Sequence, residues 1–165
     1  MNMIEVHPNL FVGSEADEQQ NRGCPGWFVI HACKEPYHRQ ALGYSGRAAA
    51  KDHAEYLIAR RDGRLILNLV DVDDVRYIGS ELVDAALSAI EDNIASMRIL
   101  LHCNQGHSRS PTIAFLYLAK YTTRFLGLTH ADALEAFRAV YPHYNPARGM
   151  ADYARINWIS YQRTA

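Results

Sequence analysis

The chain has 165 residues, of which 48% are hydrophobic and 21% charged, a composition typical of one globular domain with a sizeable core. Its formal net charge of −1 excludes the global basicity of a nucleic-acid or membrane-surface binder. No apolar run approaches the roughly 18 residues of a membrane-spanning helix, and the first ten residues lack a signal-peptide pattern. We therefore expect a monomeric domain over 1–165 with neither nucleic acid nor membrane as a partner.

The three cysteines, Cys24, Cys33 and Cys103, show neither a CxxC motif nor the spacing of zinc ligands. An odd number of thiols is typical of a reducing compartment, which predicts a cytoplasmic protein. We expect Cys24 and Cys33 to be small, buried apolar side chains rather than a redox relay. The sequence indicates no metal site and no cofactor.

The N-terminal part of the chain predicts strands separated by one short helix. Loose alternation over 4–12 predicts a short strand and a turn. Ser14, with Asp17 three positions later, predicts the N-cap of a helix over 15–22. Residues 27–32 are apolar and β-prone, which predicts a buried strand.

The segment 33–64 is polar, and its pattern predicts no definite element. It carries seven Lys and Arg residues against four Asp and Glu residues. One interpretation is a rim that faces an anionic ligand. The other, which we favour, is a solvated loop and helix.

Residues 65–70, LILNLV, predict a second buried strand that runs directly into Asp71. A helix with apolar residues at a spacing near 3.6 is expected to begin at residue 79 or 80, and 98–101 predict another strand. A strand–helix–strand unit implies a parallel pair with a right-handed crossover. That crossover places Asp71 and Cys103 at the same edge of the sheet.

The C-terminal third predicts three helices. Residues 111–122 are apolar nearly all round, which indicates a buried helix. Thr129 and Asp132 predict the start of a second helix that ends at Pro142, and 150–161 predict a last amphipathic helix. The expected fold is one α/β domain, with a central twisted, mostly parallel sheet of four or five strands flanked by helices.

The chemistry-bearing stretch lies between the strand that leads to Cys103 and the apolar helix. Arg109 follows the cysteine by six positions, and Ser110 and Pro111 predict the N-cap and first position of the helix. The loop therefore sits at a helix N-terminus, where unpaired N–H groups and the helix dipole favour anions. Such a place binds a phosphate and stabilises a thiolate.

Each residue type suits phosphate chemistry. Cys103 offers a nucleophile, and Arg109 a planar fork of donors for two phosphate oxygens. Gly106 relieves steric conflict where the backbone bends, and Ser110 could hydrogen-bond the sulfur and ease its departure. The alternative is a buried cysteine on a strand with a surface arginine nearby.

The stretch HCNQGHSRS resembles the His-Cys-x5-Arg-Ser signature of the cysteine-dependent protein tyrosine phosphatases, and most closely their compact dual-specificity branch. The Leu-x-x-Gly-Ser pattern that ends at Ser14 and the loop at 141–146 are similar to the same family. The resemblance implies metal-free hydrolysis of a phosphorylated substrate through a phosphocysteine on Cys103. It also implies that the loop binds the phosphate through Asn104, Gln105, Gly106, His107, Ser108 and Arg109.

The mechanism needs an aspartic acid that protonates the leaving oxygen. Asp71, Asp73 and Asp74 all lie at separations from Cys103 that fall within the family's range. Strand-end geometry favours Asp71, whereas alignment of the following helix favours Asp73. The two carboxylates that do not act as the general acid are expected to be solvated, and one of them is expected to cap the next helix.

Two other functions remain open from the sequence. One is a phosphate-binding pseudophosphatase that recognises phosphorylated partners without hydrolysing them. The other is a sulfurtransferase-like cysteine enzyme, although these typically have a shorter loop. The natural substrate is left open among phosphopeptides, phosphoinositides and nucleotide or RNA phosphates.

Overall fold

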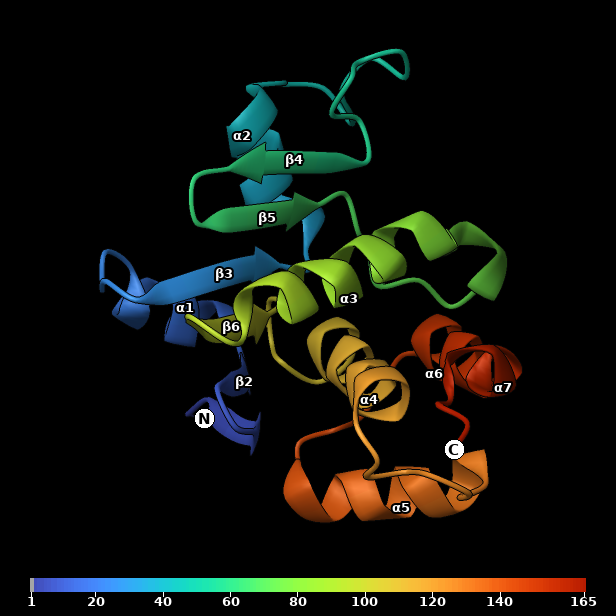
Figure 1. Cartoon of the computed structure of the whole chain (residues 1–165). Helices are drawn as coiled ribbons and strands as arrows, with labels where there is room; N and C mark the ends of the chain where they lie inside the picture. The colour runs from blue at the N-terminus through green and yellow to red at the C-terminus, as the bar shows by residue number, and fades with distance from the viewer. Residues whose placement is uncertain (1) are drawn as a thin grey trace.

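Four parallel strands form the centre of a six-stranded sheet in the computed structural model, which describes residues 2–165 (Figure 1). The strand order is β1-β2-β6-β3-β5-β4, with antiparallel strands β1 and β4 at the edges. The strands are β1 (Ile4–His7), β2 (Leu10–Gly13), β3 (Trp27–His31), β4 (Ile58–Arg61), β5 (Arg64–Leu67) and β6 (Arg98–His102).

The central strands are apolar because helices cover both of their faces. Ile99, Leu100 and Leu101 of β6 are consecutive and fully buried, as expected for a parallel sheet. The predicted mostly parallel α/β fold is therefore confirmed, but the sheet has six strands rather than four or five. Part of the difference lies at 4–12, which forms a hairpin that turns at Asn9, with a φ of 67°, instead of one strand and a turn.

The other unexpected strand is β4, which lies inside the segment left unassigned. Its sequence, IARR, lacks an apolar run, and among residues 2–165 it pairs only with β5. The outer side of its Arg60 peptide is occupied by neighbouring side chains. The Arg60 N–H donates to Glu55 at 2.9 Å, and its carbonyl accepts from Arg61 at 2.7 Å. These contacts protect the edge from pairing with another strand.

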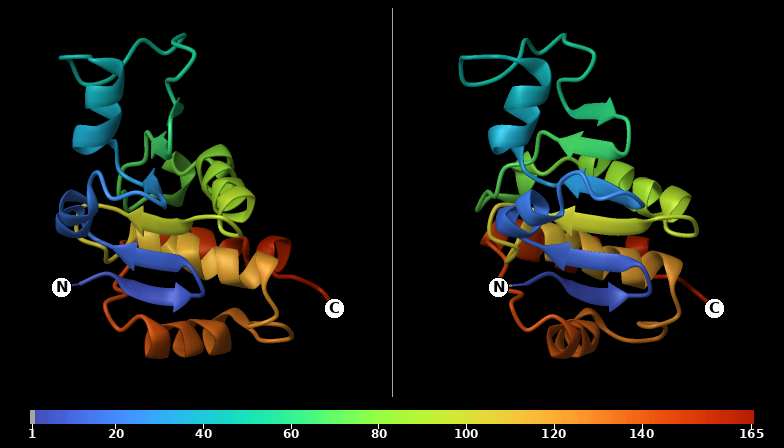
Figure 2. Two further views of the ribbon diagram at one scale, coloured as in Figure 1. Left: turned by 60° about the vertical axis from the view of Figure 1, so that its left-hand side comes forward. Right: turned by 90° about the vertical axis from the view of Figure 1, so that its left-hand side faces the viewer.

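Helices lie on both faces of the sheet, as the two turned views show (Figure 2). Helix α1 and the turn η1 cover one face, while α3 and α4 cover the other, with α5, α6 and α7 around α4. The helical elements are α1 (Glu15–Asn21), η1 (Lys34–His38), α2 (Arg39–Leu42), η2 (Val75–Tyr77), α3 (Ser80–Asn93), α4 (Arg109–Tyr121), α5 (His130–Val140), α6 (Arg148–Ile156) and α7 (Trp158–Tyr161).

The largest part of the core surrounds Phe115 of the buried helix α4. Its ring stacks on Trp158 of α7 at 5.0 Å between centroids and packs against Phe137 of α5 at 5.3 Å. The predicted helix at 111–122 thus exists, but it begins two residues earlier. A buried helix held from three sides gives the preceding loop a rigid support.

Most predicted helix boundaries are close to those observed. The capping box at Ser14 and Asp17 is present, and Thr129 accepts from the Asp132 N–H at 3.2 Å. The predicted last helix is interrupted at Asn157, so it forms α6 and α7. Cys24 is exposed, contrary to the expectation of burial, because it lies in a turn. Over residues 2–165, none of the helices has the length and apolarity needed to cross a membrane.

Candidate active site

Cys103 lies directly after β6, where the chain turns toward helix α4. Its side chain is buried, and its Sγ is 3.2 Å from the Ser110 hydroxyl. Ser110 was expected to be the N-cap, which is wrong: α4 begins at Arg109, and Ser108 occupies the cap position without a side-chain cap bond. Ser110 instead faces inward, where its Oγ is also 3.4 Å from the Gly13 carbonyl. Its single hydroxyl proton can therefore be directed either to the Gly13 carbonyl or to the Cys103 sulfur.

Arg109 is held beside the cysteine by two oxygen acceptors. One terminal nitrogen donates to the Leu69 carbonyl at 3.0 Å, and the other donates to Asn104 Oδ1 at 2.7 Å. Asn104 in turn donates to the Glu35 carbonyl at 2.8 Å. The Nε of Arg109 is buried and has no partner within residues 2–165. The Asn104 side chain thus orients the guanidinium, while Nε remains a free donor.

The part of the loop that is expected to bind phosphate is shaped by Gly106, whose φ of 75° favours glycine. The Gly106 carbonyl accepts from the Tyr141 hydroxyl at 2.7 Å, and the His107 carbonyl accepts from the Asn145 N–H at 2.8 Å. The His107 ring donates from Nδ1 to the His143 carbonyl at 3.0 Å. By contrast, the N–H groups of residues 104–108 have no carbonyl partner within residues 2–165, so they are available to an anion.

Asp71, in the segment that follows β5, lies beside the same loop. The strand ends at Leu67 rather than at residue 70, because the chain leaves the sheet and the Leu69 carbonyl binds the Lys34 N–H and Arg109. Asp71 Oδ1 accepts from the Ser108 hydroxyl at 2.8 Å, and Ser108 Oγ accepts from the Ala147 N–H at 2.9 Å.

These side chains line one open pocket of about 360 Å³. It includes most of the predicted site residues, but Gly106, Ser110 and Asp73 do not line it. The lining residues are Asp71, Cys103, Asn104, Gln105, His107, Ser108, Arg109, Asn145, Pro146 and Ala147. The arrangement places a thiol, a guanidinium, free N–H groups and a carboxyl group around one space.

The structure does not bring Asp73 or Asp74 into this pocket. Both line a separate pocket of about 420 Å³ with residues of η2 and α6. Asp74 accepts the Arg76 N–H at 2.9 Å and pairs with the Arg76 guanidinium at 2.7 Å. Hydrogen bonding to the Arg76 side chain lowers the pKa of Asp74 to about 2, so it holds no proton at neutral pH. Asp74 is thus the carboxylate that caps the next helical turn.

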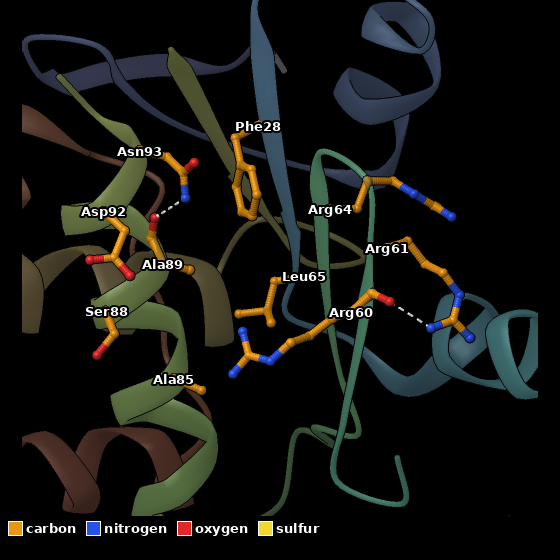
Figure 3. A pocket seen from close by; sticks show the side chains of 10 residues that line it. All are labelled: Phe28, Arg60, Arg61, Arg64, Leu65, Ala85, Ser88, Ala89, Asp92 and Asn93. Carbon is orange, nitrogen blue, oxygen red and sulfur yellow. Dashed lines mark hydrogen bonds between the residues drawn. The ribbon is translucent and has the colours of Figure 1, made fainter. Parts of the chain in front are cut away.

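Three arginines of the ambiguous segment also lie away from Cys103. Arg60, Arg61 and Arg64 line a pocket of about 290 Å³ at the start of β5, the end of the strand remote from Asp71 (Figure 3). Arg60 extends into this pocket toward α3, whereas Arg61 turns outward and pairs with Glu55 at 2.9 Å. These arginines therefore do not form a rim around the candidate active site.

Sequence reasoning missed two contributors to the site. Ala147 acts through its backbone N–H, for which a side-chain pattern contains no signal. His31 is fully buried at the end of β3, where its ring contacts His102. The only available signal was the position of His31 near the end of a predicted parallel strand.

The fold defined by this sheet and loop is that of the dual-specificity phosphatases. The crystal structure of DUSP15 superposes with a TM-score of 0.59 at 22% identity, over 98% of this chain and 90% of that one. A human tyrosine phosphatase-like serine/threonine/tyrosine-interacting protein superposes with a TM-score of 0.60 at 18% identity, over 97% of both chains. At these identities the similarity establishes the fold alone.

In sequence, the chain is 34% identical over 100 residues to a probable dual specificity protein phosphatase of Dictyostelium discoideum. The matched part is 58% of this chain and 42% of the relative, so the match spans less than half of that relative's length. No family model matches the chain. The resemblance to dual-specificity phosphatases that the HCNQGHSRS stretch predicted is confirmed.

Proposed function

We propose that this chain is a phosphomonoester hydrolase of the dual-specificity phosphatase type, with residues 1–165 as one catalytic domain. The observation that carries the proposal is the pocket in which Cys103, Arg109 and Asp71 meet. The relative that is named as a probable dual specificity protein phosphatase supports the class, and the structural neighbours support the fold. The partner is a phosphorylated protein or small phosphomonoester.

In the first step, the Cys103 thiolate attacks phosphorus and the bond to the leaving oxygen breaks. The free N–H groups of 104–108 and the Arg109 guanidinium bind the equatorial oxygens, where negative charge is concentrated. Protonated Asp71 transfers its proton to the leaving oxygen. Asp71 is preferred over Asp73 because it alone of the two lines the Cys103 pocket.

In the second step, water attacks the phosphocysteine. The Asp71 carboxylate accepts the proton from this water, and the phosphorus–sulfur bond breaks to release phosphate. Ser110 donates a hydrogen bond to the departing sulfur from its position 3.2 Å away. Proton and charge then return to their starting positions, since Asp71 is again protonated and Cys103 is again a thiolate.

The experiment is rapid quenching of the protein during turnover of p-nitrophenyl phosphate, followed by mass spectrometry of the Cys103 peptide. We expect steady turnover and a phosphoryl group on Cys103. Cys103→Ser should lose turnover by about 10⁴-fold or more but retain tungstate binding. Tungstate binding without turnover by the wild-type protein would instead favour a phosphate-binding pseudophosphatase. Turnover by Cys103→Ser at wild-type rates would exclude Cys103 as the nucleophile.

A further inference from the structure

Two histidines lie side by side beneath the start of the phosphate-binding loop. His31 ends β3 and His102 ends β6, and they are direct partners in the parallel ladder between these strands. Both side chains are fully buried. His31 Nδ1 is 2.7 Å from His102 Nε2, a hydrogen-bond distance between the two rings.

The hydrogen-bond partners determine where each ring carries its proton. His102 Nδ1 is 3.2 Å from the Cys103 carbonyl, which can only accept, so Nδ1 carries the proton. A neutral imidazole has one N–H, so His102 Nε2 is an acceptor. His31 Nδ1 must then be the donor to it. The chain of donors runs from His31 through His102 to the Cys103 carbonyl.

The surroundings keep both rings neutral and fixed. Burial lowers the pKa of His31 to about 2 and that of His102 to about 4. The Tyr37 ring stacks on His31 at 4.4 Å, and its hydroxyl donates to Glu18 at 2.9 Å. The charged groups that face the pair from neighbouring elements are Asp17, Glu18 and Arg22 around α1, Arg64 of β5 and Arg109 of α4.

Packing alone does not explain a histidine at position 31. Its Nε2 is buried and has no hydrogen-bond partner within residues 2–165. A buried acceptor without a donor is destabilising, and a phenylalanine would provide a similar ring for Tyr37 without it. The feature that phenylalanine lacks is the Nδ1–H donor to His102.

We infer that His31 is a positioning residue for the nucleophile: its Nδ1–H holds His102 as the Nδ1–H tautomer, which anchors the Cys103 carbonyl. The His102 N–H directs the positive end of its dipole at the Cys103 carbonyl, and the His31 N–H polarises His102 in the same sense, which favours the thiolate. The inference rests on the proposed function, because it assigns His31 a part in preparing that nucleophile. Nothing in it requires His31 to touch the substrate.

The test compares His31→Phe, which keeps a ring but removes the donor, with His31→Asn, whose amide N–H lies near the position of Nδ1. ¹⁵N NMR of the ring nitrogens should show His102 as the Nδ1–H tautomer in the wild-type protein and in His31→Asn. In His31→Phe the Nε2–H tautomer should become populated. With p-nitrophenyl phosphate, His31→Phe should lower kcat on the order of tenfold at a similar KM, and His31→Asn should restore most of it.

A second readout does not depend on catalytic turnover. Alkylation of Cys103 by iodoacetamide, measured against pH, should have its midpoint at higher pH in His31→Phe than in the wild-type protein and His31→Asn. If the wild-type protein hydrolyses nothing, the proposed function fails, while tautomer and alkylation still test the positioning of Cys103. An Nε2–H tautomer in wild-type His102 would overturn the inference even if His31→Phe does not fold. A folded His31→Phe with wild-type kcat and alkylation would also overturn it.

Discussion

The hydroxyl of Ser108 joins the phosphate-binding loop to Asp71, a residue 37 positions earlier in the chain, through a 2.8 Å hydrogen bond. Ser108 is itself fixed by the Ala147 N–H at 2.9 Å. Its oxygen accepts from the Ala147 N–H and its proton is directed to Asp71 Oδ1, so Asp71 Oδ2 is the oxygen that would act in the proposed proton transfer. The loop that binds phosphate therefore also orients the proposed acid.

Asp71→Asn should slow hydrolysis most for substrates with poor leaving groups. A general acid typically contributes roughly 10²–10⁴-fold, and an aryl ester with an acidic phenol needs little of that help. We expect a loss in this range for tyrosyl and alkyl phosphates and a much smaller loss for the activated ester, with a flattened basic limb of the pH–rate profile. Steady-state kinetics on the two ester types measure it.

The neighbouring carboxylates are the matched controls for this prediction. Asp74→Asn should retain near-normal leaving-group dependence, because Asp74 is paired with Arg76 in another pocket. If Asp73→Asn shows the leaving-group-dependent loss and Asp71→Asn does not, the acid is Asp73. That outcome would mean that the segment after β5 rearranges when substrate binds.

Ser108→Ala should act on the same step as Asp71. Without the hydroxyl, the carboxylate loses its anchor, and we expect on the order of tenfold slower hydrolysis of tyrosyl phosphates. In the Asp71→Asn background, the same change should cost much less, because the orientation of an acid no longer matters. A double-mutant cycle of kcat/KM measures the coupling. Additive losses would indicate that Ser108 acts on phosphate binding rather than on the orientation of Asp71.

Arg109→Lys should lower kcat/KM by about 10²–10³-fold, because an ammonium group cannot reproduce two fixed donors toward phosphate oxygens. Tungstate affinity, measured by calorimetry, should fall as well. Near-normal kinetics of Arg109→Lys would show that Arg109 does not stabilise the transition state.

Chelators should leave the wild-type rate unchanged, since in the proposed mechanism Arg109 and backbone N–H groups bind the phosphate oxygens.

Gly149→Ala should destabilise the fold near Asp71. A β-carbon at Gly149 would clash with the Val72 carbonyl, which accepts the Gly149 N–H at 3.0 Å. We expect the free energy of unfolding to fall by about 1–3 kcal/mol, measured by urea denaturation. Gly46→Ala is the control, because the added β-carbon would meet nothing within 4 Å. An equal effect of the two substitutions would contradict the close approach of α6 to Val72.

The buried histidine pair should make the fold sensitive to acid. The pKa of His102 falls from 6.5 to about 4 and that of His31 to about 2, since burial disfavours the charged rings. Below pH 6.5 the unfolded chain therefore binds protons that the folded state excludes, so stability is lost as pH falls toward 4. The slope should reach about 1.4 kcal/mol per pH unit for each histidine. Urea denaturation at several pH values measures this, and the free energy of unfolding should decline less steeply with falling pH in His31→Phe than in the wild-type protein.

Several elements could be predicted from the local sequence because local interactions produce them. The capping box of Ser14 and Asp17 closes within four residues, and the apolar run of α4 requires burial wherever it packs. The strand, loop and helix around Cys103 follow from a β-prone run, a glycine and a helix start. The edge strand β4 could not be predicted in this way, because its pairing with β5 and its protection by Glu55 produce no apolar pattern in the sequence.

The sequence by itself predicted the α/β class, and it identified the proposed nucleophile and the proposed phosphate-binding loop, because Cys103, Arg109 and their spacing lie within one short stretch. Only the tertiary structure decided that Asp71 rather than Asp73 or Asp74 shares the Cys103 pocket. It also decided that His31 meets His102. These contacts depend on where separate strands end in the sheet and how the chain leaves them, and neither is set by the side chains of a local segment.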